Sequence, residues 1–153
     1  MKFFKLFVLM AAAVVANPTL AAGDAEAGEA KAAPCAACHG PGGSKPIAGN
    51  YPKLAGQGEA YLVKQLQDYK SGKRENAIMA GQAANLSEQD MADLGAYYAS
   101  QEAQSGQADP EWVEQGAKLY RGGDAANGLP ACSGCHGPAG QGIDGAKYPH
   151  LAG

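Results

Sequence analysis

The sequence is poor in several kinds of residue, and each shortage excludes a class of protein. Arginine occurs only at Arg74 and Arg121, and the 15 acidic residues outnumber the 12 basic ones. A nucleic-acid-binding surface needs basic side chains to contact phosphates, so this composition argues against nucleic acid as a partner. The longest apolar run, from Leu6 to Ala16, is too short to span a bilayer.

Cysteine is also scarce, and all four cysteines lie in two copies of one C-x-x-C-H pattern, so no thiol is left over for a disulfide. The copies are Cys35, Cys38 and His39, and Cys132, Cys135 and His136. This pattern is typical of covalent haem attachment. Each thiol can form a thioether with a haem vinyl group, and the adjacent histidine can bind the iron. We therefore expect two covalently bound c-type haems.

A C-x-x-C pair has two other common uses. A thioredoxin-like dithiol follows a strand, and no β-branched run precedes either motif. A structural zinc site would pair two such motifs about 15–20 residues apart, whereas these lie 97 residues apart and each has its own histidine. Zinc or free thiols remain the alternatives to haem.

The residues after each motif repeat as well. Residues 35–56 and 132–153 are identical at 11 of 22 positions without a gap, so the chain carries two copies of one module. A metal-bound histidine usually donates its second ring N–H to a carbonyl or carboxylate. The carbonyl of Pro52 is placed to accept from His39, and Leu54 is expected against the haem face. Pro149 and Leu151 repeat this arrangement.

The chain begins with a predicted secretory signal peptide. Lys2 and Lys5 precede the apolar run, and small residues follow it, so cleavage is expected after Ala21 or Ala22. Its removal would take the net charge from −3 to −5. Export also suits c-type haem, because the haem is attached outside the cytoplasm.

Four helices are expected from composition and apolar spacing. Gly28, inside the first, either allows another helix to cross closely or is an ordinary mid-helix glycine. Ser87 and Asp90 resemble a capping box. The expected helices span 24–33, ended by Pro34, then 59–71, ended by Gly72, then 87–100 and 111–121. The predicted division is 1–22 signal peptide, 23–100 first domain, 101–110 linker and 111–153 second domain.

A second axial ligand for the first haem can be sought among four methionines. Met1 and Met10 leave with the signal peptide, and Met91 lies on an apolar stripe with Leu94 and Tyr98. Met79 lies in a stretch, 74–86, that reads as an irregular loop. A thioether ligand favours ferrous iron and raises the potential. We assign His39 and Met79 to the first haem; the alternative is a methionine that packs on apolar surface.

The second module lacks a matching methionine. The 17 residues after His136 contain only one strong donor, His150, which matches Lys53 in the repeat and is predicted to be a surface histidine. The first module continues 43 residues beyond Gly56, but the chain stops at the equivalent Gly153. We expect an incomplete second domain, more readily a fragment of a longer reading frame than a natural truncation.

The doubled C-x-x-C-H-G, the Y-P-x-L-A-G after each copy, the Y-L-V-K-Q-L stretch and the S-E-Q-D-M stretch together resemble the dihaem cytochrome c4 family. The resemblance covers the chain after the signal peptide. It implies an all-α fold of two tandem class I cytochrome c domains, the second incomplete here. It also implies haem held by the four cysteines, His39 and His136 as proximal ligands and Met79 as the first distal ligand.

The same resemblance implies a periplasmic electron carrier that passes single electrons along a respiratory chain. Quinol–cytochrome c reductase is then the expected donor and a terminal oxidase the acceptor, with peripheral association with the inner membrane. The competing interpretations are a haem enzyme or ligand-binding protein that uses an open second site, and a structural metal module. No distal His–Arg pair is recognisable, so a carrier rather than an enzyme is predicted.

Overall fold

The computed structural model describes residues 22–152, so the predicted signal peptide lies outside it except for Ala22. Within this range the chain is helical, and its only β structure is two isolated bridges. The helices are α1 (Ala25–Lys31), α2 (Ala33–His39), η1 (Pro41–Gly43), α3 (Glu59–Ser71), α4 (Ala77–Ala83), α5 (Glu88–Ser100), α6 (Pro110–Gly122), η2 (Ala125–Asn127), α7 (Ser133–His136) and η3 (Asp144–Ala146). The predicted all-α class is confirmed. None of the described helices has the length and apolarity needed to cross a membrane.

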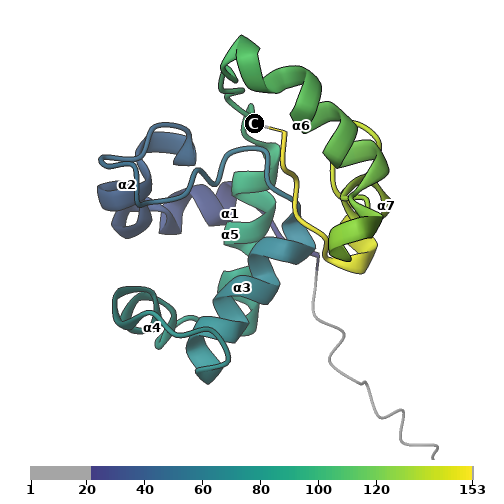
Figure 1. Ribbon diagram of the computed structural model, residues 1–153. Coiled ribbons are helices and arrows are strands. Elements are labelled where there is room, and N and C mark those ends of the chain that lie inside the picture. The colour runs from purple at the N-terminus through teal and green to yellow at the C-terminus, as the bar shows by residue number, and fades with distance from the viewer. Residues whose placement is uncertain (1–21, 153) are drawn as a thin grey trace, which may run out of the picture.

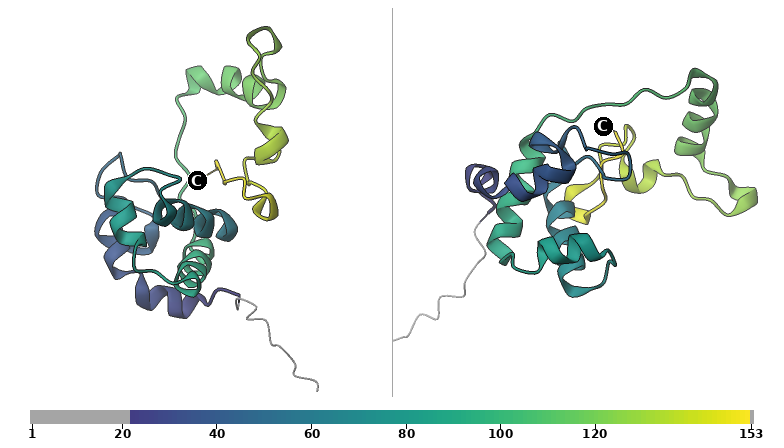
Figure 2. Two further views of the ribbon diagram at one scale, coloured as in Figure 1. Left: turned by 90° about the horizontal axis from the view of Figure 1, so that it is seen from below. Right: turned by 90° about the vertical axis from the view of Figure 1, so that its left-hand side faces the viewer.

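The helices form two groups, which we call the first module (α1 to α5) and the second module (α6 to residue 152). Residues 102–109 join them without regular secondary structure, as the long connection in Figure 2 shows. The end of the second module returns to the first, because η3 contacts α3. The two modules therefore also touch directly, in addition to being joined by the connection.

The core of the first module lies where α1 crosses α5 (Figure 1). Ala32, Leu62, Leu94 and Tyr98 form its buried cluster. A Cβ atom at Gly28 would lie 2.1 Å from the backbone oxygen of Asp93, so only glycine permits this crossing. Of the two interpretations of Gly28, the close helix crossing is confirmed.

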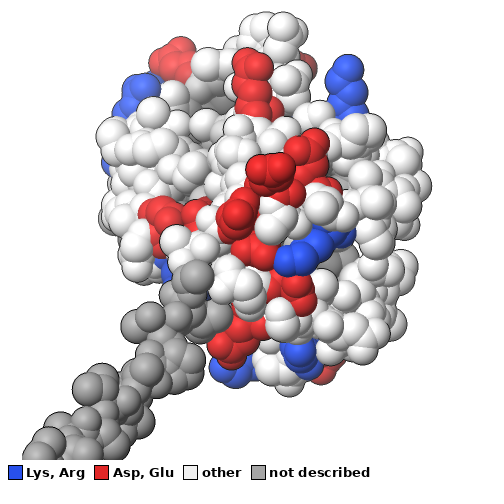
Figure 3. Space-filling view, turned by 180° about the vertical axis from the view of Figure 1, so that it is seen from behind, with Lys and Arg blue, Asp and Glu red and all other residues white. Residues whose placement is uncertain are grey.

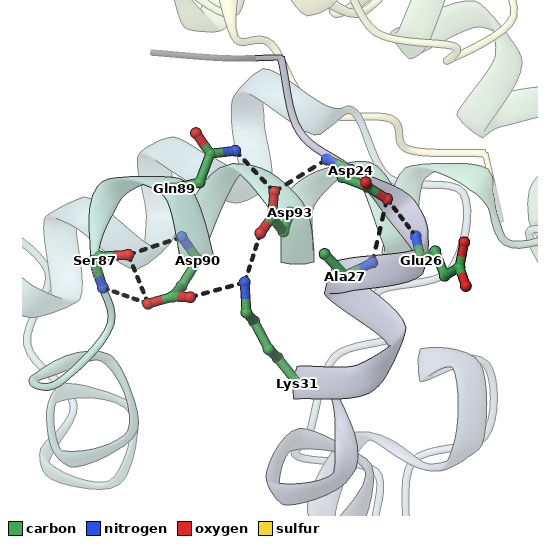
Figure 4. Close-up of polar contacts among 8 residues, drawn as sticks. All are labelled: Asp24, Glu26, Ala27, Lys31, Ser87, Gln89, Asp90 and Asp93. Carbon is green, nitrogen blue, oxygen red and sulfur yellow. Dashed lines mark hydrogen bonds and ion pairs between the residues drawn. The ribbon is translucent and has the colours of Figure 1, made fainter. Parts of the chain in front are cut away.

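A buried carboxylate fastens the two crossing helices (Figure 4). Asp93, only 3% exposed, accepts hydrogen bonds from Asp24 N at 3.0 Å, Gln89 Nε2 at 2.8 Å and Lys31 Nζ at 2.6 Å. All its neighbours donate, so the charge is compensated within the protein. Lys31 Nζ also lies 2.9 Å from Asp90 Oδ1. Asp90 and Ser87 form the capping box that the sequence predicts.

The helix that ends at Gly72 was predicted correctly. α3 spans Glu59–Ser71, and Gly72 caps it in the left-handed conformation with φ +77°. The expectation for Pro34 was wrong: α1 already ends at Lys31, and Pro34 lies in the first turn of α2. Proline is favoured there because its missing N–H needs no partner. It therefore starts the helix that carries the first cysteine motif.

The predicted irregular loop 74–86 was also wrong in part, because it contains α4 with Met79 inside it. Asn76 caps this helix, and its Oδ1 accepts from the backbone N–H of Met79 at 3.0 Å. Asparagine before Ala77 is an N-cap signal that the sequence does carry. Only one turn of apolar periodicity follows it, so the helix is too short to show a repeating pattern.

The crossing predicts that Gly28→Ala destabilises the protein. The added methyl group meets backbone rather than a movable side chain, so we expect a loss of roughly 1–3 kcal/mol in the free energy of unfolding. Gly122→Ala in α6 meets nothing within 4 Å and should be neutral or stabilising by up to about 1 kcal/mol. Denaturant titration of both variants checks this, and equal effects would contradict the close crossing.

The Asp93 carboxylate predicts a specific loss of stability in acid. Hydrogen bonds from Lys31, then from the Asp24 amide and Gln89, lower the pKa of Asp93 from 3.8 to about 2. Its contribution is thus present above pH 4 and is lost as the pH falls from about 4 towards 2. Denaturant midpoints measured at pH 6, 4 and 3 should fall less steeply in Asp93→Asn than in the wild type. Asp109→Asn, at the exposed cap of α6, should follow the wild type.

Candidate haem-attachment sites

The first candidate site is built on the short helix α2. Cys35, Cys38 and His39 are at relative positions i, i+3 and i+4, which share one face of a helix. The helix ends at Gly40, whose φ of +78° and ψ of 164° suit glycine alone. A Cβ atom there would lie 2.0 Å from the carbonyl oxygen of Lys45. Glycine thus lets the chain turn sharply straight after the histidine.

The imidazole of His39 is buried and held in one orientation. It is 5% exposed, and its Nδ1 lies 2.8 Å from the carbonyl oxygen of Pro52, so the hydrogen bond expected from the sequence is present. A carbonyl only accepts, so in the neutral imidazole Nδ1 carries the proton and Nε2 has the free lone pair. This is the tautomer that binds a metal through Nε2.

The second candidate site repeats this geometry. His136 Nδ1 lies 2.9 Å from the carbonyl oxygen of Pro149, and Gly137 has the same φ of +78° and ψ of 164° as its counterpart in the first site. A tyrosine edge meets the imidazole in both sites, with ring centroids 6.2 Å apart for His39–Tyr51 and 6.0 Å for His136–Tyr148. The two motifs are thus equivalent in structure as well as in sequence.

The loop that supplies the proline carbonyl is fixed in the same way in both modules. Leu54 N donates to Gly43 O at 2.8 Å, and Leu151 N donates to Gly140 O at 2.7 Å. In the second module Tyr120 adds a hydrogen bond from its hydroxyl to Gly137 O at 2.5 Å. These contacts hold the loop that carries the accepting carbonyl.

The two sites differ in how they are covered. In the first module α5 closes the side next to Gly43, where Tyr98 and Leu54 pack. The second module instead has a hollow beside α6, lined by Gly116, Tyr120 and other residues. Its large apolar side chains are largely exposed: Trp112, Val113, Leu119, Leu129, Ile143, Tyr148 and Leu151.

The other predicted ligand, Met79, is half-buried in α4, which packs on α3. Helices α2 and α4 lie on the same side of the α3–α5 pair in Figure 1. Met91, which the sequence assigned to the core, is 1% exposed. The assignment of Met79 as a ligand stays a prediction.

His150, which the sequence predicts to be a surface histidine, is partly exposed, but it also makes a contact that the sequence did not predict. Its Nδ1 lies 2.6 Å from the carbonyl oxygen of Gly56 in the other module. In the repeat, His150 matches Lys53, and a comparison within the repeat cannot show contacts between the two modules.

Sequence reasoning also missed a polar group beside the first motif. Tyr98 is 4% exposed, and its hydroxyl is buried without a hydrogen-bond partner among the described residues. Cys35 packs against the same cluster, and burial raises the pKa of both the thiol and the phenol. Its apolar helical spacing assigned Tyr98 to the core, and nothing in the sequence marks its hydroxyl as unpaired.

The residues present fit a haem. Each site has two thiols on or next to one short helix, α2 or α7, and an imidazole with no contact assigned to its Nε2. In the first site Cys35 packs against the buried apolar cluster, which suits the apolar vinyl edge of a haem.

Comparison with known proteins agrees with this geometry. Residues 25–102 match the family model of cytochrome c. Cytochrome c4 of Pseudomonas aeruginosa is 59% identical over 133 residues, which are 87% of this chain and 66% of that protein. The thiosulfate dehydrogenase electron acceptor of Thiomonas intermedia is 42% identical and is matched over 58% of its length by 80% of this chain.

A solved structure shows the same likeness. The crystal structure of reduced recombinant cytochrome c4 from Pseudomonas stutzeri has a TM-score of 0.79 and 50% identity, covering 85% of this chain and 73% of that one. The chain spans about two thirds of the length of the curated cytochromes c4 that it matches. Cytochromes c hold haem covalently, which accounts for the paired cysteines with their adjacent histidine. The chain belongs to the cytochrome c4 family.

Proposed function

We propose that this protein is a periplasmic electron carrier with two c-type haems, one on each C-x-x-C-H motif, in a respiratory chain. The observation that carries the proposal is the repeated orientation of an imidazole by a proline carbonyl, at 2.8 Å in one module and 2.9 Å in the other. A structure that prepares the same free Nε2 twice is suited to two metal centres of one kind.

Each residue then has a defined part. Cys35 and Cys38 would hold one haem and Cys132 and Cys135 the other, His39 and His136 would bind the two irons, and Met79 would be a further ligand to the first. Bound haem would supply one-electron exchange at its iron. The hydrogen bond to the proline carbonyl fixes the orientation of each imidazole and makes its Nε2 a stronger donor.

Location and partners belong to the same proposal. The predicted signal peptide, residues 1–22, would deliver the chain to the periplasm, with domains at 23–100 and 111–153 and a linker at 101–110. The expected donor is quinol–cytochrome c reductase and the acceptor a terminal oxidase, with transient docking and peripheral association with the inner membrane. Acidic side chains form a band on the rear face in Figure 3, which disfavours nucleic acid as a partner.

A haem enzyme is the second candidate, and the exposed apolar side chains of the second module favour it. A peroxidase-like site needs distal groups that act on the bound molecule. The third histidine, His150, lies at the contact between the modules, where its Nδ1 donates to Gly56 O. No distal His–Arg pair is recognisable in the sequence, so the carrier is the better-supported function.

Covalent attachment predicts a mass increase of two haems in protein made with a c-type maturation system. The double substitution Cys132→Ala and Cys135→Ala should reduce this to one haem, because each motif holds its haem independently. Ser133→Ala, inside the same motif, should retain both. Intact mass and an acidic organic extraction provide the measurements. Colour that washes out completely would contradict thioether attachment at either motif.

The assignment of Met79 predicts that Met79→Ala opens the first haem. Carbon monoxide should then bind to one more haem than in the wild type, and the potential of that haem should fall, because the thioether that favours ferrous iron is gone. Ile78→Ala, at the exposed neighbouring position of α4, is the matched control and should behave like the wild type. Visible spectra with and without carbon monoxide provide the test, and an unchanged spectrum in Met79→Ala refutes the assignment.

A further inference from the structure

Four hydrogen bonds join the end of the second module to the first, at Gly56, Gln57, Ala60, Asp144 and His150, which we call the clasp. Gln57 Nε2 donates to His150 O at 3.1 Å, and His150 N donates to Gln57 Oε1 at 2.7 Å. His150 Nδ1 donates to Gly56 O at 2.6 Å, and Ala60 N donates to Asp144 Oδ1 at 3.0 Å. The clasp lies where the C-terminal loop returns to α3 in Figure 1.

On the second module, the clasp holds the residue next to the proximal carbonyl. Gln57 uses both its amide donor and its amide acceptor on the backbone of His150, so the contact fixes direction as well as distance. The preceding residue, Pro149, accepts the hydrogen bond from His136. The orientation of the second imidazole is thus tied to a side chain of the first module.

On the first module, the clasp holds the corresponding loop. Gly56 follows Pro52, the acceptor for His39, by four residues and is itself anchored, because Gly56 N donates to Tyr98 O of α5 at 2.9 Å. The clasp therefore connects the proximal loop of one candidate haem site directly to the proximal loop of the other.

Asp144 completes a helix of the other module. α3 begins after Gly58, which has no side chain to cap it, and Asp144 Oδ1 accepts from the Ala60 amide as an N-cap carboxylate would. A negative charge at this end also suits the helix dipole. A Cβ atom at Gly58 would lie 2.7 Å from that same oxygen, so glycine leaves the room that Asp144 occupies.

The equivalent residue in the first copy of the repeat also makes a contact outside its own loop. His150 corresponds to Lys53, the variable residue between proline and leucine in each Y-P-x-L-A-G. Lys53 also reaches outside its own loop, because its Nζ donates to Gln104 O in the connection between the modules. In both copies, this position fastens the proximal loop to another part of the protein.

We propose that Gln57, Asp144 and His150 are positioning residues that hold the two proximal loops in one relative orientation, and that electron exchange between the haems depends on them. This dependence rests on the proposed function, whereas the contact itself does not. Electron exchange requires the two centres to stay at a set separation. Residues 102–109 alone, without regular secondary structure, would leave that separation variable.

The contact is tested by amide hydrogen exchange in the haem-loaded protein. Gln57→Ala should expose the His150 amide, and both Asp144→Ala and Gly58→Ala should expose the Ala60 amide. We expect exchange to be roughly fivefold faster or more, the factor for a lost helix cap. Asp109→Ala, which removes a cap inside α6, should affect the Glu111 amide and neither clasp amide. Unchanged exchange at both clasp amides would overturn the proposal.

Pulse reduction tests whether electron exchange depends on the clasp. One haem is reduced by a pulse, and the rate at which the electron equilibrates with the other haem is measured. His150→Ala should slow this step several-fold, whereas His150→Asn, which keeps a side-chain N–H donor, should retain it. The visible spectrum and haem content of each site should not change. An unchanged rate of electron exchange in His150→Ala would refute the positioning role. A wild-type protein that binds no haem would instead refute the proposed function, and the exchange result at the clasp would stand.

Discussion

The hydrogen bond from an imidazole N–H to a proline carbonyl is the interaction on which the rest of this structure depends. It selects the tautomer of His39 and His136 and leaves Nε2 free in each. To form it, the chain must turn immediately after the histidine and bring a loop back 13 residues later. Gly40 and Gly137 allow that turn with φ of +78°, which other residues rarely adopt.

Helix packing then decides how well each prepared histidine is shielded. In the first module α1 and α5 cross at Gly28, and the Asp93 carboxylate binds them together. His39 is buried in this module, whereas His136 in the second is only partly buried. The second module has the same motif geometry, but its apolar side chains remain exposed in the described residues. The local geometry of the motif therefore does not depend on how deeply the motif is buried, because it is the same in both modules.

Prediction from the sequence succeeded where the signal was local and repeated. The C-x-x-C-H copies, the accepting carbonyl at Pro52 and the helix ended by Gly72 each depend on residues close together in the chain. It was wrong for short helices. Pro34 starts a helix rather than ending one, and Met79 lies in a helix of seven residues, because one or two turns show too little periodicity to be recognised.

The sequence by itself determined the chemistry: two thiol pairs, their adjacent histidines and the glycines and prolines that set the backbone around them. These follow from the identity and spacing of neighbouring residues, which covalent geometry converts directly into local structure. Only the tertiary structure decided that the Tyr98 hydroxyl has no hydrogen-bond partner among the described residues and that His150 lies between the modules. Both facts depend on which distant segments meet, and the pattern of residues along one segment carries no record of the surface it will contact.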